Sequence, residues 1–169
     1  MTGAAAAAGL VFAILATGAA QSSEQAFAQS SAQVSDCAEN RVDLRGDWGT
    51  ARFTVELADD EAERARGLMN RKHLAGSAGM LFVYPHPQRV AFWMENTLIP
   101  LDMIFLDAAG RVKRVAADAV PLDRTPIDGG PAILAVLEIN GGLAARLGIL
   151  PGTELRHPAF GPDAAWPCN

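Results

Sequence analysis

The stretch LDMIFLDAAGRVKRV, residues 101–115, decides the fold because it places two strand patterns on either side of one turn. Residues 101–106 are apolar except for Asp102, which is typical of a strand that is buried on both faces. Residues 107–110 have the composition of a turn, and residues 111–115 then alternate polar and apolar side chains as a hairpin partner does. The stretch therefore predicts an antiparallel hairpin.

Further strands are predicted on both sides of this hairpin. Apolar runs or alternating patterns occur at residues 52–57, 80–84, 90–94, 132–139 and 153–156. Pro85 and Pro87 are expected to end the second of these strands, because proline cannot donate a hydrogen bond to a sheet. Residues 120–131 hold several prolines and glycines, so they are expected to form an exposed loop.

A first short helix is predicted after residue 58. Asp59 or Asp60 caps it, and Glu63 follows Asp60 at the spacing of a capping box. Gly67 either ends this helix or brings its backbone close to a neighbour. The expected inner face comprises Ala62, Ala65, Leu68 and Met69.

A second short helix is expected to be capped by Asn140 and to end at Gly148. About seven strands and two short helices do not alternate as βαβ units. The pattern predicts an α+β fold, a compact, mostly antiparallel, β-barrel-like sheet with two short helices.

The N-terminal residues have the features of a secretory signal. The first 23 residues carry no charged side chain, residues 10–15 are apolar, and Ala26-Phe27-Ala28 fits a cleavage site. We predict a signal peptide over residues 1–28, a flexible linker over 29–40 and a single β-rich domain over 41–169. An uncleaved anchor is the alternative, but only about six strongly apolar residues stand where roughly 20 are needed for a span.

Two cysteines lie near the ends of the predicted mature chain, Cys37 and Cys168. In the oxidising environment outside the cytoplasm they should pair as a disulfide. The alternative is a pair of free thiols on mobile tails. Together with the leader, the pairing predicts a periplasmic or secreted protein that is not integral to the membrane after cleavage.

The balance of acidic and basic residues limits the classes of partner that the protein is expected to bind. The chain has 169 residues, 14 Lys and Arg against 19 Asp and Glu, and a formal net charge of −5. An excess of acidic residues does not favour a positively charged surface that would bind a phosphate backbone, so no nucleic-acid partner is predicted. A length of 169 residues leaves room for one domain.

Five blocks in a fixed order carry a resemblance to a known family. They are Glu63-Arg64-x-x-Gly67-Leu68-Met69, Gly79-Met80-Leu81-Phe82, Phe92-Trp93-Met94-Glu95-Asn96-Thr97, Pro100-Leu101-Asp102-Met103-Ile104-Phe105 and Val136-Leu137-Glu138-Ile139. In this order the chain resembles the domain-of-unknown-function 192 family over roughly residues 50–157. The resemblance implies a compact, β-rich domain that is often exported, and it implies no reaction.

The segment from Trp93 to Asp102 has the densest set of ligand-orienting groups. We predict that a small polar ligand, or an envelope or protein partner, is bound by Arg66, Trp93, Asn96, Thr97 and Asp102. The arginine would clamp an anion, the indole would offer a stacking face, and the other three would orient the ligand.

Two alternatives to binding stay open. In the first, the protein is an acid/base enzyme in which Asp102 works with Glu95 or Glu138. In the second, the motif residues are purely structural: Asn96 and Thr97 build a turn, and Asp102 is held by an arginine such as Arg64 or Arg66.

No cofactor and no metal site is predicted. Four methionines lie near His73 and His86, a combination that suits Cu(I), but each falls within an apolar element where Met is ordinary core filler. Ser77 is the only serine beyond residue 36, so a serine nucleophile is also not expected.

Overall fold

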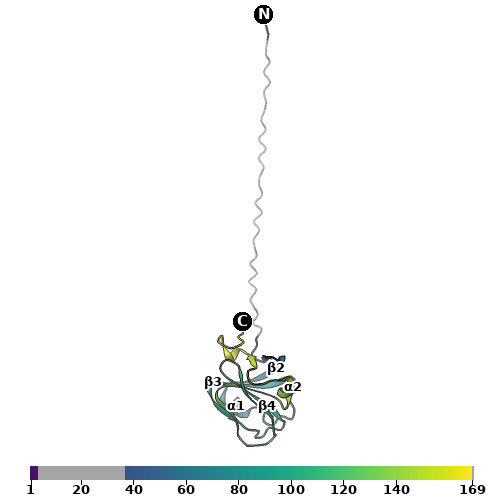
Figure 1. The fold of residues 1–169 in the computed structure, drawn as a ribbon, viewed down its shortest axis with the longest axis vertical. Coiled ribbons are helices and arrows are strands. Elements are labelled where there is room, and N and C mark those ends of the chain that lie inside the picture. The colour runs from purple at the N-terminus through teal and green to yellow at the C-terminus, as the bar shows by residue number, and fades with distance from the viewer. Residues whose placement is uncertain (4–36, 169) are drawn as a thin grey trace. The chain divides into compact units, whose positions relative to one another are not determined.

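The computed structural model of the chain describes residues 1–3 and 37–168 (Figure 1). The chain divides into two units, Met1–Ala32 and Gln33–Asn169, and every helix and strand named below lies in the second. In the first unit, the described residues carry no helix or strand. Almost all of the predicted signal peptide and most of the predicted linker lie outside the described residues, so both stay predictions.

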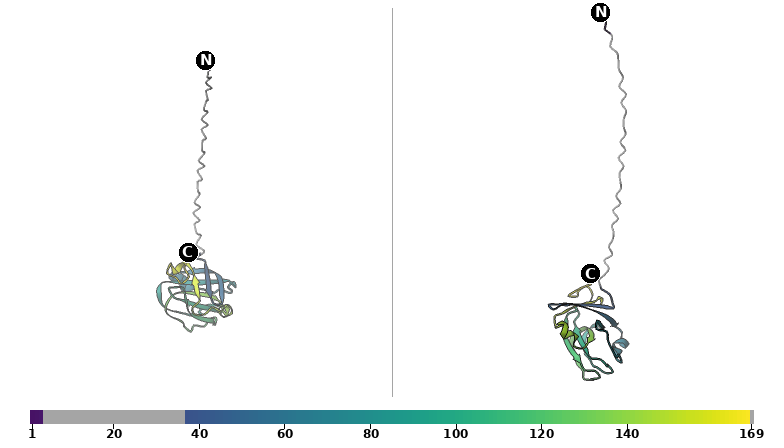
Figure 2. Two further views of the ribbon diagram at one scale, coloured as in Figure 1. Left: turned by 45° about the horizontal axis from the view of Figure 1, so that its top comes forward. Right: turned by 90° about the vertical axis from the view of Figure 1, so that its right-hand side faces the viewer.

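Seven strands and two short helices are found in the described part of the second unit, and the strands form one curled sheet (Figure 1, Figure 2). In chain order the elements are β1 (Arg41–Gly46), β2 (Gly49–Ala58), α1 (Glu61–Arg66), β3 (Ala78–Phe92), β4 (Leu101–Leu106), β5 (Val112–Ala119), β6 (Ile127–Asn140), α2 (Leu143–Leu147), β7 (Glu154–Arg156) and a 3₁₀ turn, η1 (Pro158–Phe160). The strand order is β5-β4-β6-β3-β2-β1-β7, and the pairs are antiparallel except β2 with β3. This architecture confirms the predicted α+β class.

The sheet curls far enough for its two edge strands to approach each other at one end. A single bridge pairs Arg111, just before β5, with Glu154 in β7. Beside it the Val112 N–H donates to the Thr153 carbonyl at 2.8 Å. Because β7 has only 3 residues, the two edges form no continuous ladder. The expected barrel is therefore corrected to a half-barrel.

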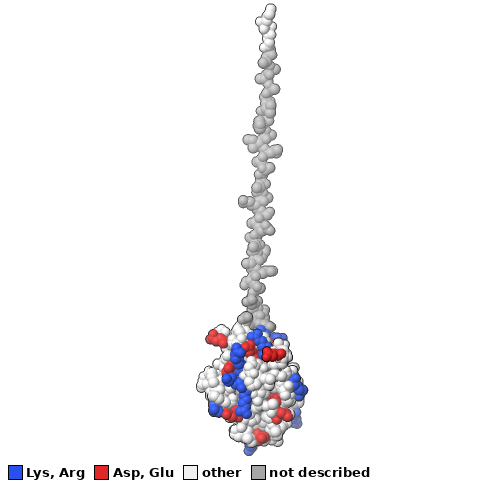
Figure 3. Space-filling view, in the orientation of Figure 1, with Lys and Arg blue, Asp and Glu red and all other residues white. Residues whose placement is uncertain are grey.

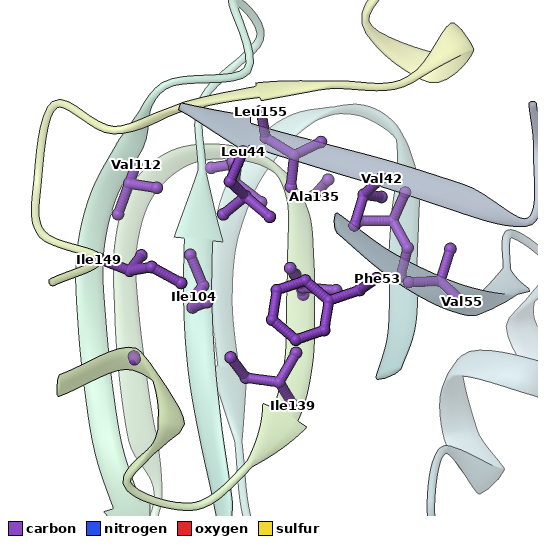
Figure 4. Packing of buried hydrophobic residues seen from close by; sticks show 14 of the residues in the cluster. Val42, Leu44, Phe53, Val55, Ile104, Val112, Ala135, Ile139, Ile149 and Leu155 are labelled. Carbon is purple, nitrogen blue, oxygen red and sulfur yellow. The ribbon is translucent and has the colours of Figure 1, made fainter. Parts of the chain in front are cut away.

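The central strands bury side chains on both faces, as their continuous apolar runs predict. In β4, Ile104 and Leu106 join one buried cluster, whereas Leu101, Met103 and Phe105 join a second. Side chains alternate along a strand, so the two clusters lie on opposite faces of the sheet. Figure 4 shows members of the first cluster from β1, β2, β6 and β7, among them Val42, Phe53, Ile139 and Leu155.

The prolines of β3 do not end the strand, contrary to the prediction. β3 continues through Pro85 and Pro87 to Phe92, with a gap in its pairing with β6 between Val83 and Gln88. On its other side the pairing with β2 stops at Phe82. The prolines therefore lie where the strand has a free edge and an interrupted ladder, which is where a sheet tolerates a residue that cannot donate.

The predicted loop over residues 120–131 is shorter than expected. β6 begins at Ile127, which pairs with Phe92 at the end of β3. Position 129 in this strand requires glycine, because its backbone packs against Phe105 and a Cβ atom would lie 2.3 Å from the ring. Gly129 therefore marks a close approach of backbone to side chain, whereas Gly130 adopts a φ of 87° in open space.

The ends of the folded unit are joined covalently. Cys37 and Cys168 form a disulfide with a Cα–Cα distance of 5.8 Å, which confirms the predicted pairing. It closes a loop with a sequence separation of 131 residues. In the chain-entropy model, closing a loop of that length stabilises the fold by about 4 to 5 kcal/mol. Next to it, Trp166 stacks with the guanidinium groups of Arg45 and Arg156.

Charged side chains of both signs are interspersed on the face of the folded unit seen in Figure 3. Many are paired: Glu154 accepts from Arg45 and Arg111, and Asp43 accepts from Arg52 and Arg156. These ion pairs lie on β1, β2, β7 and the turn before β5. In these pairs two carboxylates are shared among four arginines, so the cluster keeps an excess of positive charge.

Candidate functional site

The first helix lies in the crossover between the two parallel strands, β2 and β3. The Asp60 side chain caps it by accepting from the Glu63 N–H at 2.7 Å, and the Glu63 carboxylate accepts from the Asp59 N–H at 3.4 Å. The Asp60 cap is confirmed, and Glu63 reaches back to the residue before the cap instead of to the N–H of Asp60 itself, as a capping box would require. The Asp60 cap fixes where the helix starts and hence which of its side chains face the sheet.

The helix ends at Gly67, which also makes the predicted close approach. Its φ of 47° lies in the region that favours glycine, and a Cβ atom there would lie 3.1 Å from the Phe82 ring. The predicted inner face is wrong in part, because Ala62 and Ala65 are exposed. The helix is too short to bury a face, and the apolar contact is made beyond its end by Leu68.

A cavity of about 240 Å³ opens between the end of α1, the second half of β3 and the segment that follows β3. We call it the α1–β3 cavity; it is lined by Arg64, Ala65, Arg66, Gly67, Leu68, Met69, Phe82, Tyr84, Ala91, Phe92, Trp93, Thr97 and Glu138. The lining of the cavity combines aromatic rings with two arginines and one carboxyl group. This mixture of apolar walls and few polar groups is typical of a small-molecule site.

Three of the five residues predicted to bind a ligand line this cavity. Arg66 is exposed and has no ion-pair partner within residues 37–168, and Trp93 is 53% exposed. Thr97 is buried, and its hydroxyl donates to the Glu95 carbonyl at 3.3 Å. The structure thus brings together one residue from α1 and two from the segment after β3.

Asn96 does not line the cavity. It is exposed, and its φ of 53° places it in the left-handed region that Asn tolerates better than most residues. Its carbonyl accepts from the Asn70 N–H at 2.7 Å. These features match the structural alternative, in which Asn96 and Thr97 build a turn.

Asp102 does not line the cavity either. Its side chain is fully buried and accepts three backbone hydrogen bonds, from Asp118 at 2.7 Å, Gly142 at 2.8 Å and Ala144 at 2.6 Å. Two of these donors belong to the start of α2, so Asp102 provides the cap that was predicted for Asn140. Asn140 instead donates to the Leu74 and Ala75 carbonyls, at 3.3 Å and 2.9 Å.

Glu138 is the carboxyl group of the cavity. Its residue is only 4% exposed, and its neighbours across β3 and β4 are Met80 and Met103. Within residues 37–168 its carboxyl group has no hydrogen-bond or ion-pair partner. Burial raises its pKa to about 8, because no partner compensates for the loss of water.

The predicted acid/base pairs are not formed. Asp102 is opposite Ile139 in the ladder, whereas Glu138 is opposite Met103, so the two carboxyl groups point to opposite faces of the sheet. Glu95 pairs with Arg124 at 2.7 Å and does not line the cavity. Sequence spacing could not reveal this, because it does not show the register.

Arg64 and Tyr84 form one wall of the cavity. The Arg64 guanidinium donates to the carbonyls of Asp59 and Val83 and lies 5.3 Å from the centre of the Tyr84 ring. Burial raises the pKa of the Tyr84 hydroxyl, so it is neutral at physiological pH. Arg64 therefore has a structural role in this wall, and Arg66 is the cation available at the rim.

No group of three or more His, Cys, Asp or Glu side chains that could hold a metal ion occurs in the described part of the chain. The methionines singled out with His73 and His86 fall in or beside the second buried cluster, where Met80, Met94 and Met103 are core residues. In the same part of the chain, no helix is both long and apolar enough to cross a membrane.

The fold and its cavity define a small α+β half-barrel domain, and comparison places it in a family. Residues 42–157 match the model of the DUF192 family, described as "Uncharacterized ACR". Because the match spans more than half of the chain, the protein belongs to this family, which confirms the resemblance inferred from its five motifs. A search among curated proteins finds no match.

Two solved structures are similar. A protein of unknown function from Novosphingobium aromaticivorans is 50% identical, with a TM-score of 0.67, over 68% of this chain and 82% of its own. A protein from Sinorhizobium meliloti, whose name marks it as a provisional transcription regulator, is 41% identical with a TM-score of 0.67, over 70% of this chain and 93% of its own. The regulatory name belongs to that protein alone.

Proposed function

We propose that this domain binds a small aromatic molecule with an anionic group in the α1–β3 cavity. The observation that carries the proposal is the convergence of Arg66, Trp93 and Thr97 on one cavity. A guanidinium without an ion-pair partner can form a bidentate pair with a carboxylate. A half-exposed indole can stack on a ring and shield that pair from water.

The size of the cavity sets the size of the ligand. An apolar cavity of about 150 Å³ is large enough for benzene. The α1–β3 cavity, at about 240 Å³, therefore suits one ring with a substituent and is smaller than the usual drug-sized pocket.

The cavity supports binding over acid/base catalysis. An acid/base mechanism in which two carboxyl groups work together needs both within reach of the substrate, and among residues 37–168 Glu138 is the one carboxyl group that lines this cavity. The Asp102 carboxylate lies on the other face of the sheet and accepts hydrogen bonds from three backbone N–H groups.

We further propose that the protein acts in the periplasm or outside the cell. The Cys37–Cys168 disulfide supports this location, because disulfides persist in oxidising compartments. The test is N-terminal sequencing of the protein recovered from the periplasm and medium of expressing cells. Cleavage after residue 28 is expected, and an uncleaved chain confined to the cytoplasm would contradict the proposal.

Binding can be tested by titrating purified protein with benzoate while following tryptophan fluorescence. The chain has three tryptophans, so W93F shows which part of the change comes from Trp93. We expect R66A to weaken benzoate binding about tenfold or more, because a charged hydrogen-bonded pair is lost.

Arg146 provides the matched control, since it is an exposed arginine in the last turn of α2 as Arg66 is in α1. R146A should bind benzoate as the unchanged protein does. Benzamide and benzylamine, of the same shape but neutral or cationic, should bind more weakly. Equal loss in R66A and R146A, or preference for benzylamine, would rule out the anion-binding role.

A second candidate, contact with an envelope protein, is favoured by an apolar rim beside the cavity. Trp93, Leu98, Val120 and Leu122 are exposed by 43% or more. They lie on two loops joined by a hydrogen bond from the Leu122 N–H to the Thr97 carbonyl at 3.1 Å. Neighbouring apolar side chains of this kind often mark an interaction surface.

A photo-crosslinking residue at position 122 should then capture one defined protein in cells. The same residue at position 150, where another exposed leucine lies after α2, should not. Identical products from both positions would argue against a docking surface at the rim.

A further inference from the structure

We propose that Glu138 donates a hydrogen bond to a carbonyl-type oxygen of the ligand at the inner end of the α1–β3 cavity. The ligand is then an aromatic acid with an acceptor at the end opposite its carboxylate. The inference rests on the proposed function, because it needs the carboxylate to be held at Arg66.

The two residues proposed to bind the polar groups of the ligand, Arg66 and Glu138, lie at different depths in the cavity. Arg66 is exposed and lies on the last turn of α1, whereas Glu138 is 4% exposed and belongs to β6, in the middle of the sheet. Both line the same cavity. A ligand whose charge stays at the rim therefore presents its other end to Glu138.

Glu138 has no hydrogen-bond partner within residues 37–168 and lines the cavity, so water or a ligand in the cavity must complete its hydrogen bonding. Buried polar groups in folded proteins almost always have a partner, because an unmet donor or acceptor costs about 1 to 3 kcal/mol. Its ladder neighbours, Met80 and Met103, offer no oxygen or nitrogen. A ligand oxygen in the cavity would satisfy the carboxyl group.

The protonation state makes Glu138 a donor. With its pKa raised to about 8, it is mostly neutral at pH 7 and carries an O–H. The other titratable groups that line the cavity are Arg64, Arg66 and Tyr84. Arg64 donates to two carbonyls, Tyr84 is neutral and Glu138 is mostly protonated at pH 7, so little negative charge opposes an anionic ligand there.

The walls between the two polar ends are aromatic. Phe82 and Phe92 pack edge to face with ring centroids 5.1 Å apart, and both line the cavity. Flat rings at such distances accept a further ring by stacking or edge contact. An aromatic body therefore fits better than a sugar, which would need hydrogen bonds along the walls.

The test compares two probes of nearly the same shape, 4-acetylbenzoate and 4-isopropylbenzoate. The first has a carbonyl where the second has only a branched alkyl group. We expect the unchanged protein to bind the acetyl compound about fivefold to tenfold more tightly at pH 6.5, the value of one hydrogen bond. Titration calorimetry gives both dissociation constants.

Variants at Glu138 separate hydrogen bonding from packing. E138L should lose the preference between the probes, whereas E138Q, which keeps an N–H donor of similar shape, should retain it. Between pH 6.5 and 9.5 the unchanged protein should lose affinity for 4-acetylbenzoate, because ionised Glu138 neither donates nor tolerates a nearby anion. E138Q should not. Circular dichroism at each pH checks that both variants fold.

The outcomes distinguish the two proposals. Equal binding of the two probes by the unchanged protein, or a preference that survives in E138L, would overturn the role of Glu138 and leave the anion site intact. Tighter binding of benzylamine than of 4-acetylbenzoate at pH 6.5 would show that Glu138 acts as an anion where it should be protonated, and would also overturn it. Failure of both acids to bind would overturn the proposed function and this inference together.

Discussion

Asp102 in β4 and Glu138 in β6 are buried carboxyl groups on neighbouring strands, one rung apart in the ladder and on opposite faces of the sheet. Asp102 accepts three backbone hydrogen bonds, and two of them hold the start of α2. Glu138 accepts none and faces a cavity. The comparison teaches that burial alone does not define a role. A carboxyl group whose hydrogen bonding is complete stabilises the fold, and one whose hydrogen bonding is incomplete marks a site.

The largest expected effect is on stability at Asp102. Asp102→Ala leaves three backbone N–H groups, one buried and two partly buried, without their acceptor, and we expect a loss of about 4 kcal/mol in the free energy of unfolding. Glu138→Leu removes an unsatisfied polar group from an apolar site and should be neutral or stabilising by about 1 kcal/mol. Urea denaturation measures both. Equal destabilisation by the two variants would end the distinction between the carboxyl groups.

The next effect is a pH dependence specific to Glu138. The folded state holds its proton up to about pH 8, whereas the unfolded chain releases it near the ordinary value of 4.5. The folded state therefore binds more protons between these values, and stability falls as the pH rises from 4.5 to 8. We expect a loss of about 4 kcal/mol over this range in the unchanged protein.

Glu138→Gln should remove this contribution and keep the others. Desolvation by itself would raise the pKa of Asp43, but hydrogen bonds from Arg52 and Arg156 outweigh it, so that pKa is lowered. The pKa of His157 is lowered by burial. Both groups are present in both proteins, so their effects cancel in the difference. Parallel stability curves for the two proteins from pH 5 to 8 would mean that Glu138 does not titrate in this range.

A smaller effect is expected at Gly67, which shapes the cavity without a polar group. Gly67→Ala places a Cβ atom 3.1 Å from the Phe82 ring on a backbone with a φ of 47°, so it should cost about 2 kcal/mol. Gly76→Ala, in open space before β3, should cost less than about 0.5 kcal/mol. Similar thermal shifts for both variants would show that the end of α1 is not fixed against β3.

Much of the fold could be predicted because its signals are local. The 101–115 hairpin, the helix cap at Asp60 and the helix end at Gly148 each follow from residues close together in the chain. The Cys37–Cys168 pair followed from the chemistry of an oxidising compartment. The continuation of β3 through its prolines could not be predicted, because it depends on where its neighbours stop pairing.

The candidate site was predicted only in part for the same reason. Arg66, Trp93 and Thr97 were chosen correctly as residues that share a cavity, although their binding role stays a prediction. Asp102 was grouped with them because it follows the same motif, but the side to which it points depends on strand register. Glu138 was noted only as a possible catalytic partner, since sequence gives no sign that a charged residue inside VLEI lacks a partner.

Titration of the Glu138 side-chain carboxyl carbon by NMR, without and with 4-acetylbenzoate, tests the central claim most directly. A pKa of about 8 is expected in the free protein. The ligand should raise it further, because it accepts a hydrogen bond from the protonated form. A carboxyl group that titrates near 4.5, with no change when the ligand is added, would contradict the claim that Glu138 is the buried donor of a binding site.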